Sequence, residues 1–301
     1  MTRPIQIPVG HLCRSIALAL VLVLGSACGD GPPYASVRSD DWRQLADRLP
    51  TDTGGEMRAV PGDRIPEAAN GFFLYAPAGH EEADSRYPLL IFFHGKGEIG
   101  DSVSDTGELE RVASLGPPGL IRNGTWDPPV PFFVFAPQAH PETYWEHVPD
   151  LIQVLLDSYP IDRSRIYMTG LSMGGYSTWW TQGTLGDHSQ VAAAVPICGG
   201  LDERRLTLDA AAENLTSVPT WAFHGGRDTV VPPGESIRIV QRVNALSPEV
   251  PVRLTLFPHL PHDSWTAVYS SDLGTPTDPA WDPFDTDIYS WMLQYRRVSR
   301  R

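Results

Sequence analysis

Short apolar runs recur along most of the chain, and they are separated by stretches in which apolar residues follow helical spacing. The runs combine aromatic and β-branched residues and are apolar on both sides, which is typical of strands buried on both faces of a parallel sheet. We expect strands at residues 72–76, 89–93, 132–135, 165–169, 191–197, 220–223 and 252–257.

Amphipathic segments between these runs predict helices. Apolar positions repeat at helical spacing in residues 41–49, 108–115, 148–159, 236–246 and 284–295. Residues 50–66 and most of residues 97–130 are instead predicted as loop. Because strands alternate with helices, we expect one α/β domain over residues 41–301, with a mainly parallel sheet and helices on both faces.

The N-terminus has a different pattern. Arg3 and Arg14 precede a short apolar core and then small residues that end at Cys28, which predicts an export signal over residues 1–27. The cysteine after the small residues resembles a bacterial lipoprotein cleavage site, although Gly25 stands where that pattern usually has a larger aliphatic residue. We therefore expect export to the cell envelope or the outside, lipid anchoring through Cys28, and a flexible tether over residues 28–40.

Charge and cysteine content narrow the function classes. The chain carries a net charge of −13, and loss of the signal with its two arginines makes it −15. Such a surface argues against nucleic acid as a ligand. If Cys28 is acylated, Cys198 is the lone cysteine of the mature chain, so it cannot form an internal disulfide, and we expect it to pack as a small hydrophobic residue.

The most informative stretch is Gly170-Leu171-Ser172-Met173-Gly174-Gly175. An apolar strand precedes it and a helix-compatible segment follows it. Gly-x-Ser-x-Gly in this context is the signature of a nucleophile elbow, in which a sharp strand-to-helix turn exposes the serine hydroxyl. Ser172 is therefore the predicted nucleophile.

A serine nucleophile needs a base, and the base needs an orienting carboxylate. In this kind of sheet the acid and then the histidine should follow the serine, each in a loop after a strand. Asp228 and His262 satisfy this order, with Asp202 and His259 as weaker candidates. His224 precedes the acid, and Asp263 is too close to His262 along the chain to orient it.

The reaction also requires donors for a developing oxyanion. The backbone N–H of Met173 follows the nucleophile directly. The second donor is expected from the loop after the strand at 89–93, where we choose the N–H of Lys96, the only lysine in the sequence.

The same loop contains Gly95-Lys96-Gly97-Glu98-Ile99-Gly100, which matches a dinucleotide-binding pattern. That interpretation requires a helix at the glycines and an acid at the end of the next strand, and the sequence supplies neither. P-loop, His-Glu-x-x-His and zinc-spaced histidine–cysteine patterns are missing from the sequence too, so we expect no cofactor and no metal.

The segments 87–98, 170–176, 224–228 and 262–265 together resemble secreted bacterial α/β-hydrolases often labelled predicted peptidases, a branch similar to feruloyl and acetylxylan esterases and to prolyl-oligopeptidase catalytic domains. The resemblance covers about residues 70–297 and implies that Ser172, Asp228 and His262 form the triad. Departures from the pattern are Lys96, Pro261 and a long loop at 272–283.

These observations favour an exported serine hydrolase that cleaves a small-molecule or polymer-linked carboxylic ester through an acyl-enzyme. Trp145, Trp180 and Trp265 are candidates for aromatic walls around the substrate or for core packing. The alternatives are a serine peptidase of the prolyl-oligopeptidase type and a binding protein that keeps the fold without the chemistry.

Overall fold

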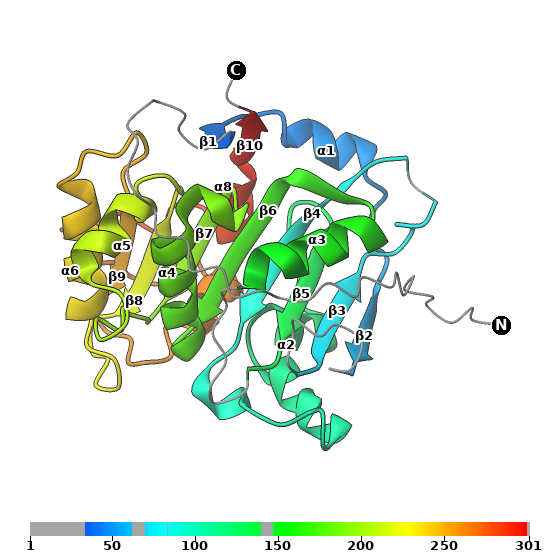
Figure 1. Ribbon diagram of the computed structural model, residues 1–301, viewed down its shortest axis with the longest axis horizontal. Helices are drawn as coiled ribbons and strands as arrows, with labels where there is room; N and C mark the ends of the chain where they lie inside the picture. The colour runs from blue at the N-terminus through cyan, green and yellow to red at the C-terminus, as the bar shows by residue number, and fades with distance from the viewer. Residues whose placement is uncertain (1–33, 62–69, 83, 140–146, 300–301) are drawn as a thin grey trace, which may run out of the picture.

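The computed structural model describes residues 34–61, 70–82, 84–139 and 147–299. The predicted signal, Cys28 and Trp145 lie outside this part of the chain. The described residues form an eight-stranded sheet in the order β2-β3-β5-β4-β6-β7-β8-β9 (Figure 1). Its strands are β2 (Glu56–Val60), β3 (Phe72–Ala76), β4 (Tyr87–Phe93), β5 (Phe133–Pro137), β6 (Ile161–Leu171), β7 (Ala193–Ile197), β8 (Trp221–Gly225) and β9 (Arg253–Phe257).

The strands from β5 to β9 in this order pair in parallel, whereas β3 is antiparallel to both β2 and β5. The chain goes from β4 to β5 on one side and then returns to β6 on the other side of β4. The direction of winding therefore reverses between β4 and β6, which is where open α/β sheets place their ligand sites, beyond the carboxyl ends of the strands.

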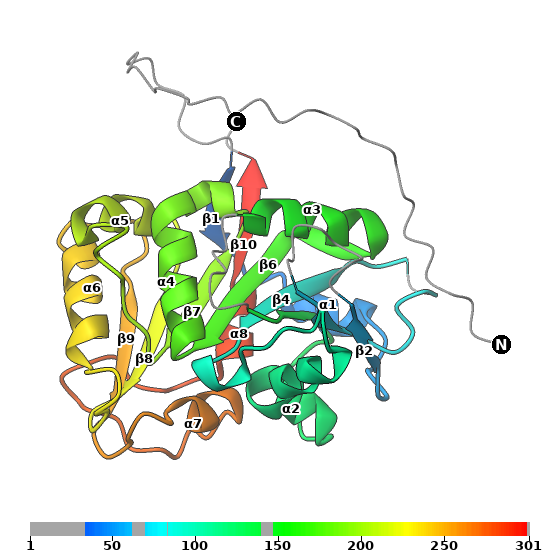
Figure 2. The same cartoon turned by 60° about the horizontal axis from the view of Figure 1, so that its bottom comes forward.

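Helices cover both faces of the sheet. In Figure 1, α3, α4, α5 and α6 lie in front of it, and α8 lies behind it. In Figure 2, α2 and α7 come forward at the lower end of the sheet. The α-helices are α1 (Arg43–Arg48), α2 (Gly116–Arg122), α3 (Val148–Ser158), α4 (Met173–Leu185), α5 (Leu208–Leu215), α6 (Gly234–Asn244), α7 (Trp265–Tyr269) and α8 (Ile288–Leu293). Across the described residues no helix is both long and apolar enough to cross a membrane.

Aromatic side chains fill the space between the sheet and the rear layer. Trp221 and Phe223 on β8 pack against Phe284 at 5.9 and 5.3 Å between ring centroids, and Trp221 also packs against Trp291 of α8 at 5.5 Å. The Arg253 guanidinium lies over the Trp221 ring at 3.8 Å. Such aromatic pairs contribute about 0.5–1.5 kcal/mol each beyond their buried area, so this cluster fixes the C-terminal segment against the sheet.

The two ends of the described chain pair with each other. β1 (Tyr34–Arg38) is antiparallel to β10 (Tyr295–Ser299), so residues 34–38 form a strand where the sequence predicted tether. The buried Arg165 on β6 joins this region to the sheet: it forms an ion pair with Asp41 and donates a hydrogen bond of 2.9 Å to the Leu293 carbonyl. These long-range contacts give the segment an order that its local composition did not predict.

Other differences between the predicted and the observed elements have local causes. Residues 56–60 were predicted as loop but form β2, an edge strand whose residues are all exposed or half-buried. The stretch beginning at Gly116 was predicted as loop because of its prolines, yet Pro117 and Pro118 occupy the first turn of α2, where a missing N–H costs nothing. The last predicted helix begins only at Ile288, because the Asp287 side chain caps it by accepting from the Ser290 N–H at 2.7 Å.

The turn from β6 into α4 requires glycine because three backbone segments meet there. A Cβ atom on Gly174 would lie 1.9 Å from the Phe93 carbonyl oxygen of β4, and one on Gly170 would lie 2.3 Å from the Gly174 carbonyl oxygen. Gly175 is equally close to the end of β7, where a Cβ atom would lie 2.4 Å from the Ile197 carbonyl oxygen. The glycines thus allow α4 to start directly against the ends of β4 and β7.

We therefore expect Gly174→Ala to lower the free energy of unfolding by about 2 kcal/mol or more, because the obstructing atom is backbone and cannot move aside. Equilibrium urea denaturation followed by circular dichroism would measure this. Gly97→Ala is the matched control, since a Cβ atom there would meet nothing within 4 Å, and it should change stability by less than about 0.5 kcal/mol. Equal stability of both variants would contradict the close-approach argument.

Candidate active site

Ser172 lies at the turn between β6 and α4, in a backbone conformation that few non-glycine residues adopt. Its φ is 54° and its ψ is −115°, and it is the residue that caps the N-terminus of α4. The Ser172 N–H donates to the Ile197 carbonyl at 3.0 Å, and its own carbonyl accepts from the Tyr176 N–H at 3.0 Å. The neighbouring strand and the first turn of the helix therefore hold the strained residue in place.

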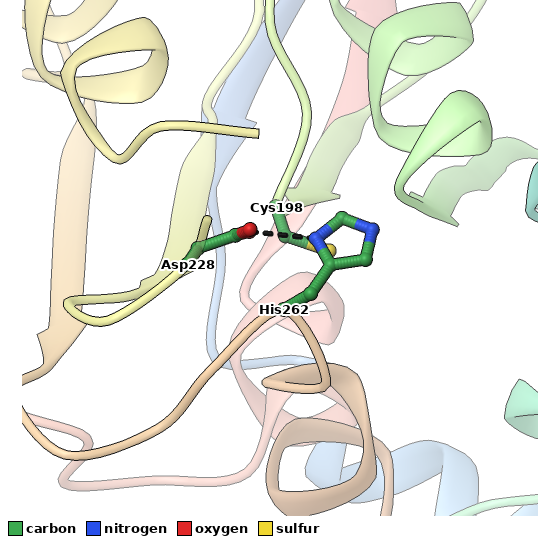
Figure 3. Close-up of side chains that lie close together, drawn as sticks. All are labelled: Cys198, Asp228 and His262. Atoms are coloured by element: carbon green, nitrogen blue, oxygen red, sulfur yellow. Dashed lines mark hydrogen bonds and ion pairs between the residues drawn. The ribbon is translucent and has the colours of Figure 1, made fainter. Parts of the chain in front are cut away.

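Two side chains from distant loops complete a hydrogen-bonded chain with Ser172. His262 follows β9, and its Nε2 lies 2.9 Å from the Ser172 Oγ. Asp228 follows β8, and its Oδ2 lies 2.6 Å from the His262 Nδ1. Figure 3 shows Asp228 and His262 pointing toward each other from separate loops. The structure thus brings together the three residues that the sequence selected.

The Asp228 carboxylate is fully enclosed and is held on both oxygens. Its Oδ1 accepts from the Val230 and Val231 N–H groups at 2.8 and 2.9 Å. Its Oδ2 faces His262 and also lies 3.3 Å from the Nε2 of His224. With these donors the carboxylate is oriented toward His262, so Nδ1 of that ring carries the proton and Nε2 is free to accept one from Ser172.

The weaker candidates for the acid and the base have other partners than Ser172, His262 and Asp228. His259 is exposed, and its Nδ1 lies 3.5 Å from an Arg227 nitrogen. Asp202 accepts hydrogen bonds from Arg204, which lower the pKa of its carboxyl to about 2. Asp263 accepts from the Thr266 N–H at 3.1 Å at the start of α7.

The loop after β4, where the second oxyanion donor was predicted, packs against the elbow. Gly95 is so close to it that a Cβ atom there would lie 2.8 Å from Leu171 Cδ1. Lys96 begins a short 3-10 helix over Lys96–Glu98, and its side chain is exposed. Met173 begins α4. The two backbone amides predicted as oxyanion donors therefore each lie at the start of a helical segment.

His94 fixes this loop, a role that sequence reasoning missed. Its Nε2 accepts from the Ala139 N–H at 2.8 Å, so its Nδ1 carries the proton and donates to the Gly95 carbonyl at 2.6 Å. Burial lowers the pKa of His94 to about 4, which keeps the ring neutral. Gln138 adds a hydrogen bond from its Nε2 to the Glu98 carbonyl at 3.2 Å. The available signal was the recurrence of Phe-His-Gly at the ends of two strands.

Cys198 lies close to His262 and Asp228. Its Sγ, a ring nitrogen of His262 and a carboxylate oxygen of Asp228 lie within 4.8 Å of one another (Figure 3). The hydrogen bond between His262 and Asp228 accounts for the closeness of those two. Burial raises the pKa of the Cys198 thiol to about 12, so the thiol stays protonated and does not compete with Ser172 as a nucleophile.

Trp265 forms one side of the site. Its ring packs edge-on against His262 with 5.3 Å between ring centroids, and the side chain is partly exposed. Trp265, one of the three tryptophans considered as aromatic walls, therefore contacts His262. Trp180 lies on α4 and is half-buried.

No family model matches this chain. Among curated proteins, a bifunctional acetylxylan esterase/xylanase, XynS20E from Neocallimastix patriciarum, is 26% identical over 170 residues, which are 54% of this chain and 22% of that protein. Among solved structures, a thermostable esterase is 26% identical with a TM-score of 0.53, covering 81% of this chain and 64% of the other. The chain thus spans less than two thirds of either relative.

More distant structures agree in fold. A feruloyl esterase module from Clostridium thermocellum, solved with sinapinate, is 16% identical with a TM-score of 0.52 and covers 78% of this chain and 91% of its own. S-formylglutathione hydrolase from Staphylococcus aureus is 13% identical with a TM-score of 0.53 and covers 81% and 99%. The strand order, the elbow and these similarities together define an α/β-hydrolase fold. The two relatives that are 26% identical over their aligned residues are the bifunctional acetylxylan esterase/xylanase and the thermostable esterase.

The geometry predicts different outcomes for the two neighbouring histidines. His262→Ala should abolish covalent labelling of Ser172 by a fluorophosphonate probe, because no base then lies within reach of the hydroxyl. His259→Ala should label at a rate within about tenfold of the wild type, a change of about 1.4 kcal/mol in barrier. In-gel fluorescence over time would measure both rates, and the reverse pattern would show that His262 is not the base.

Proposed function

We propose that this protein is an exported serine hydrolase that cleaves carboxylic esters through an acyl-enzyme. One observation carries the proposal: a strained serine at the start of a helix is hydrogen-bonded to a histidine, which is hydrogen-bonded to an enclosed carboxylate. In the proposed roles Ser172 is the nucleophile, His262 the general base and acid, and Asp228 the residue that orients His262.

In the first half of the proposed reaction, Ser172 Oγ attacks the carbonyl carbon of the ester and its proton passes to Nε2 of His262. The Met173 and Lys96 N–H groups stabilise the oxyanion of the tetrahedral intermediate, and losing one such donor typically costs about 3–4 kcal/mol of barrier. The intermediate then expels the alcohol, which leaves with the proton from His262, and the acyl group stays on Ser172.

In the second half, water takes the place of the alcohol. His262 accepts a proton from the water as it attacks the acyl carbon, and the same amides stabilise the second oxyanion. Collapse of this intermediate releases the carboxylic acid and returns the proton from His262 to Ser172. Asp228 keeps its negative charge throughout and stabilises the imidazolium that forms twice in each cycle.

The choice of an ester over a peptide bond rests on the relatives, since the acetylxylan esterase/xylanase and the thermostable esterase are each 26% identical to this chain. The chemistry is also less demanding, because an alkoxide leaves more readily than an amine, which needs a well-placed proton. Trp265 beside His262 offers an aromatic wall, which suits an aryl or sugar-linked ester. A serine peptidase of the prolyl-oligopeptidase type is the alternative.

Export rests on the sequence. The arginines, apolar core and small residues before Cys28 favour signal cleavage and lipid anchoring there. The described fold is compatible with an anchor at that position, since the first described strand, β1, begins at Tyr34.

Ser172→Ala should leave the fold intact and lower kcat on a reactive aryl ester by several orders of magnitude, because the attacking oxygen is removed. Assays of the wild type on acyl esters of several chain lengths, feruloyl and acetyl sugar esters, polyesters and short peptides would identify the preferred class. Turnover of Ser172→Ala within tenfold of the wild type would refute the proposed nucleophile. A wild type that cleaves peptides but no ester would favour the peptidase, and a wild type inert to every substrate and to fluorophosphonate would favour a binding protein.

Globomycin, which blocks lipoprotein signal cleavage, should cause an uncleaved precursor to accumulate in cells if Cys28 is acylated. Immunoblotting of the membrane fraction would show the shift in mass. Cys28→Ala should yield the same uncleaved species without the drug. Normal processing of the wild type under globomycin would instead indicate an ordinary signal peptide.

A further inference from the structure

His224 is a buried histidine that the mechanism above leaves without a role, although it touches the orienting carboxylate. It lies on β8, four residues before Asp228, and its side chain is 0% exposed. Its Nε2 lies 2.9 Å from the Val231 carbonyl oxygen and 3.3 Å from the Asp228 Oδ2. Its Nδ1 lies 2.8 Å from the hydroxyl of Ser236 on α6, which is also fully buried.

These contacts determine the tautomer of the ring. A carbonyl oxygen can only accept, so Nε2 must carry the proton and donate to the Val231 carbonyl, with the Asp228 Oδ2 3.3 Å from the same nitrogen. The other nitrogen is then an acceptor, and the Ser236 hydroxyl donates to it. The Val231 carbonyl therefore fixes the tautomer, and the Ser236 hydroxyl holds the ring by bonding to its other nitrogen.

The ring donates without adding charge. Burial lowers the pKa of His224, which favours the neutral form. The ionisable groups that face it are Asp228 and His262, with the buried, protonated Cys198 thiol close to both. A cationic donor at this position would offset the charge of Asp228 and weaken its attraction for the His262 imidazolium, whereas a neutral N–H orients the carboxylate and leaves its charge available.

We propose that His224 is a positioning residue that locks the Asp228 carboxylate and its loop in the orientation that the His262 base requires, with Ser236 holding its other ring nitrogen. This inference rests on the proposed function of the site. The Val230 and Val231 amides hold Oδ1, and His224 donates to the Val231 carbonyl with its Nε2 3.3 Å from Oδ2. Rotation of the carboxylate out of line with Nδ1 would therefore break contacts on both oxygens.

Two substitutions at this position separate the donated hydrogen bond from simple packing. In His224→Gln the side-chain amide nitrogen can occupy the place of the ring Nε2 and donate, whereas His224→Leu fills the space without a donor. We expect His224→Leu to lower kcat on the preferred ester by about tenfold to 100-fold with KM little changed, because misplacing a catalytic group by a fraction of an ångström has effects of this size. His224→Gln should recover most of that loss.

The pH profile provides a readout that a packing defect would not move. If His224→Leu lets the carboxylate turn away from Nδ1, the His262 imidazolium is less well stabilised, so the acid limb of kcat/KM should shift to lower pH in His224→Leu and stay in place in His224→Gln. Ser236→Ala should show a smaller shift in the same direction. His259→Gln is the control, because His259 is exposed and lies in the neighbouring loop. This variant should match the wild type in both kcat and the position of the acid limb.

Thermal melts of each variant decide whether a loss of activity reflects unfolding. If His224→Leu does not fold, the comparison of Ser236→Ala with the wild type carries the test. Equal loss in the Gln and Leu variants with an unmoved acid limb would overturn the inference, as would kcat of a folded His224→Leu within threefold of the wild type. A wild type that reacts with neither esters nor fluorophosphonate would instead contradict the proposed function itself.

Discussion

Close backbone packing at the turn from β6 into α4 is the constraint on which the site depends. The Phe93 carbonyl oxygen at the end of β4 occupies the space that a side chain on Gly174 would need, and the end of β7 lies equally close to Gly175. Because the glycines carry no side chains, α4 can start where the ends of three strands meet. Ser172 then has a positive φ, and its hydroxyl projects beyond the sheet toward the loops that follow β8 and β9. A strained residue of this kind persists only because its surroundings leave it no alternative.

Two buried histidines at the ends of strands contact loops on different sides of this turn. His94, after β4, uses both ring nitrogens to fix the loop that carries the Lys96 amide. His224, at the end of β8, contacts the loop that carries Asp228 through Nε2 and the Ser236 hydroxyl of α6 through Nδ1. Burial lowers the pKa of both rings, so each acts as a neutral donor and acceptor of fixed tautomer. By contrast, the partly exposed His262 contacts the Ser172 hydroxyl through its Nε2.

Sequence reasoning found the three central residues because their order along the chain reflects the topology of the sheet. Ser172, Asp228 and His262 each follow an apolar run, and parallel strands bring such positions to one edge. The same reasoning missed β1, β2 and β10, since their residues are polar enough to be read as loop or as the end of a helix. It also missed α5 and α7, which have only eight and five residues.

By itself the sequence determined which segments are buried strands, where the strained turn lies and which residue types follow each strand, because local pattern and glycine placement carry that information. Only the tertiary structure decided that His262 rather than His259 reaches Ser172, that Asp228 receives N–H donors on both oxygens, and that the two ends of the described chain pair with each other. These outcomes depend on loop paths and on contacts between residues far apart in the chain. A hydrogen bond such as that from Arg165 to the Leu293 carbonyl joins positions whose neighbours in sequence give no sign of it.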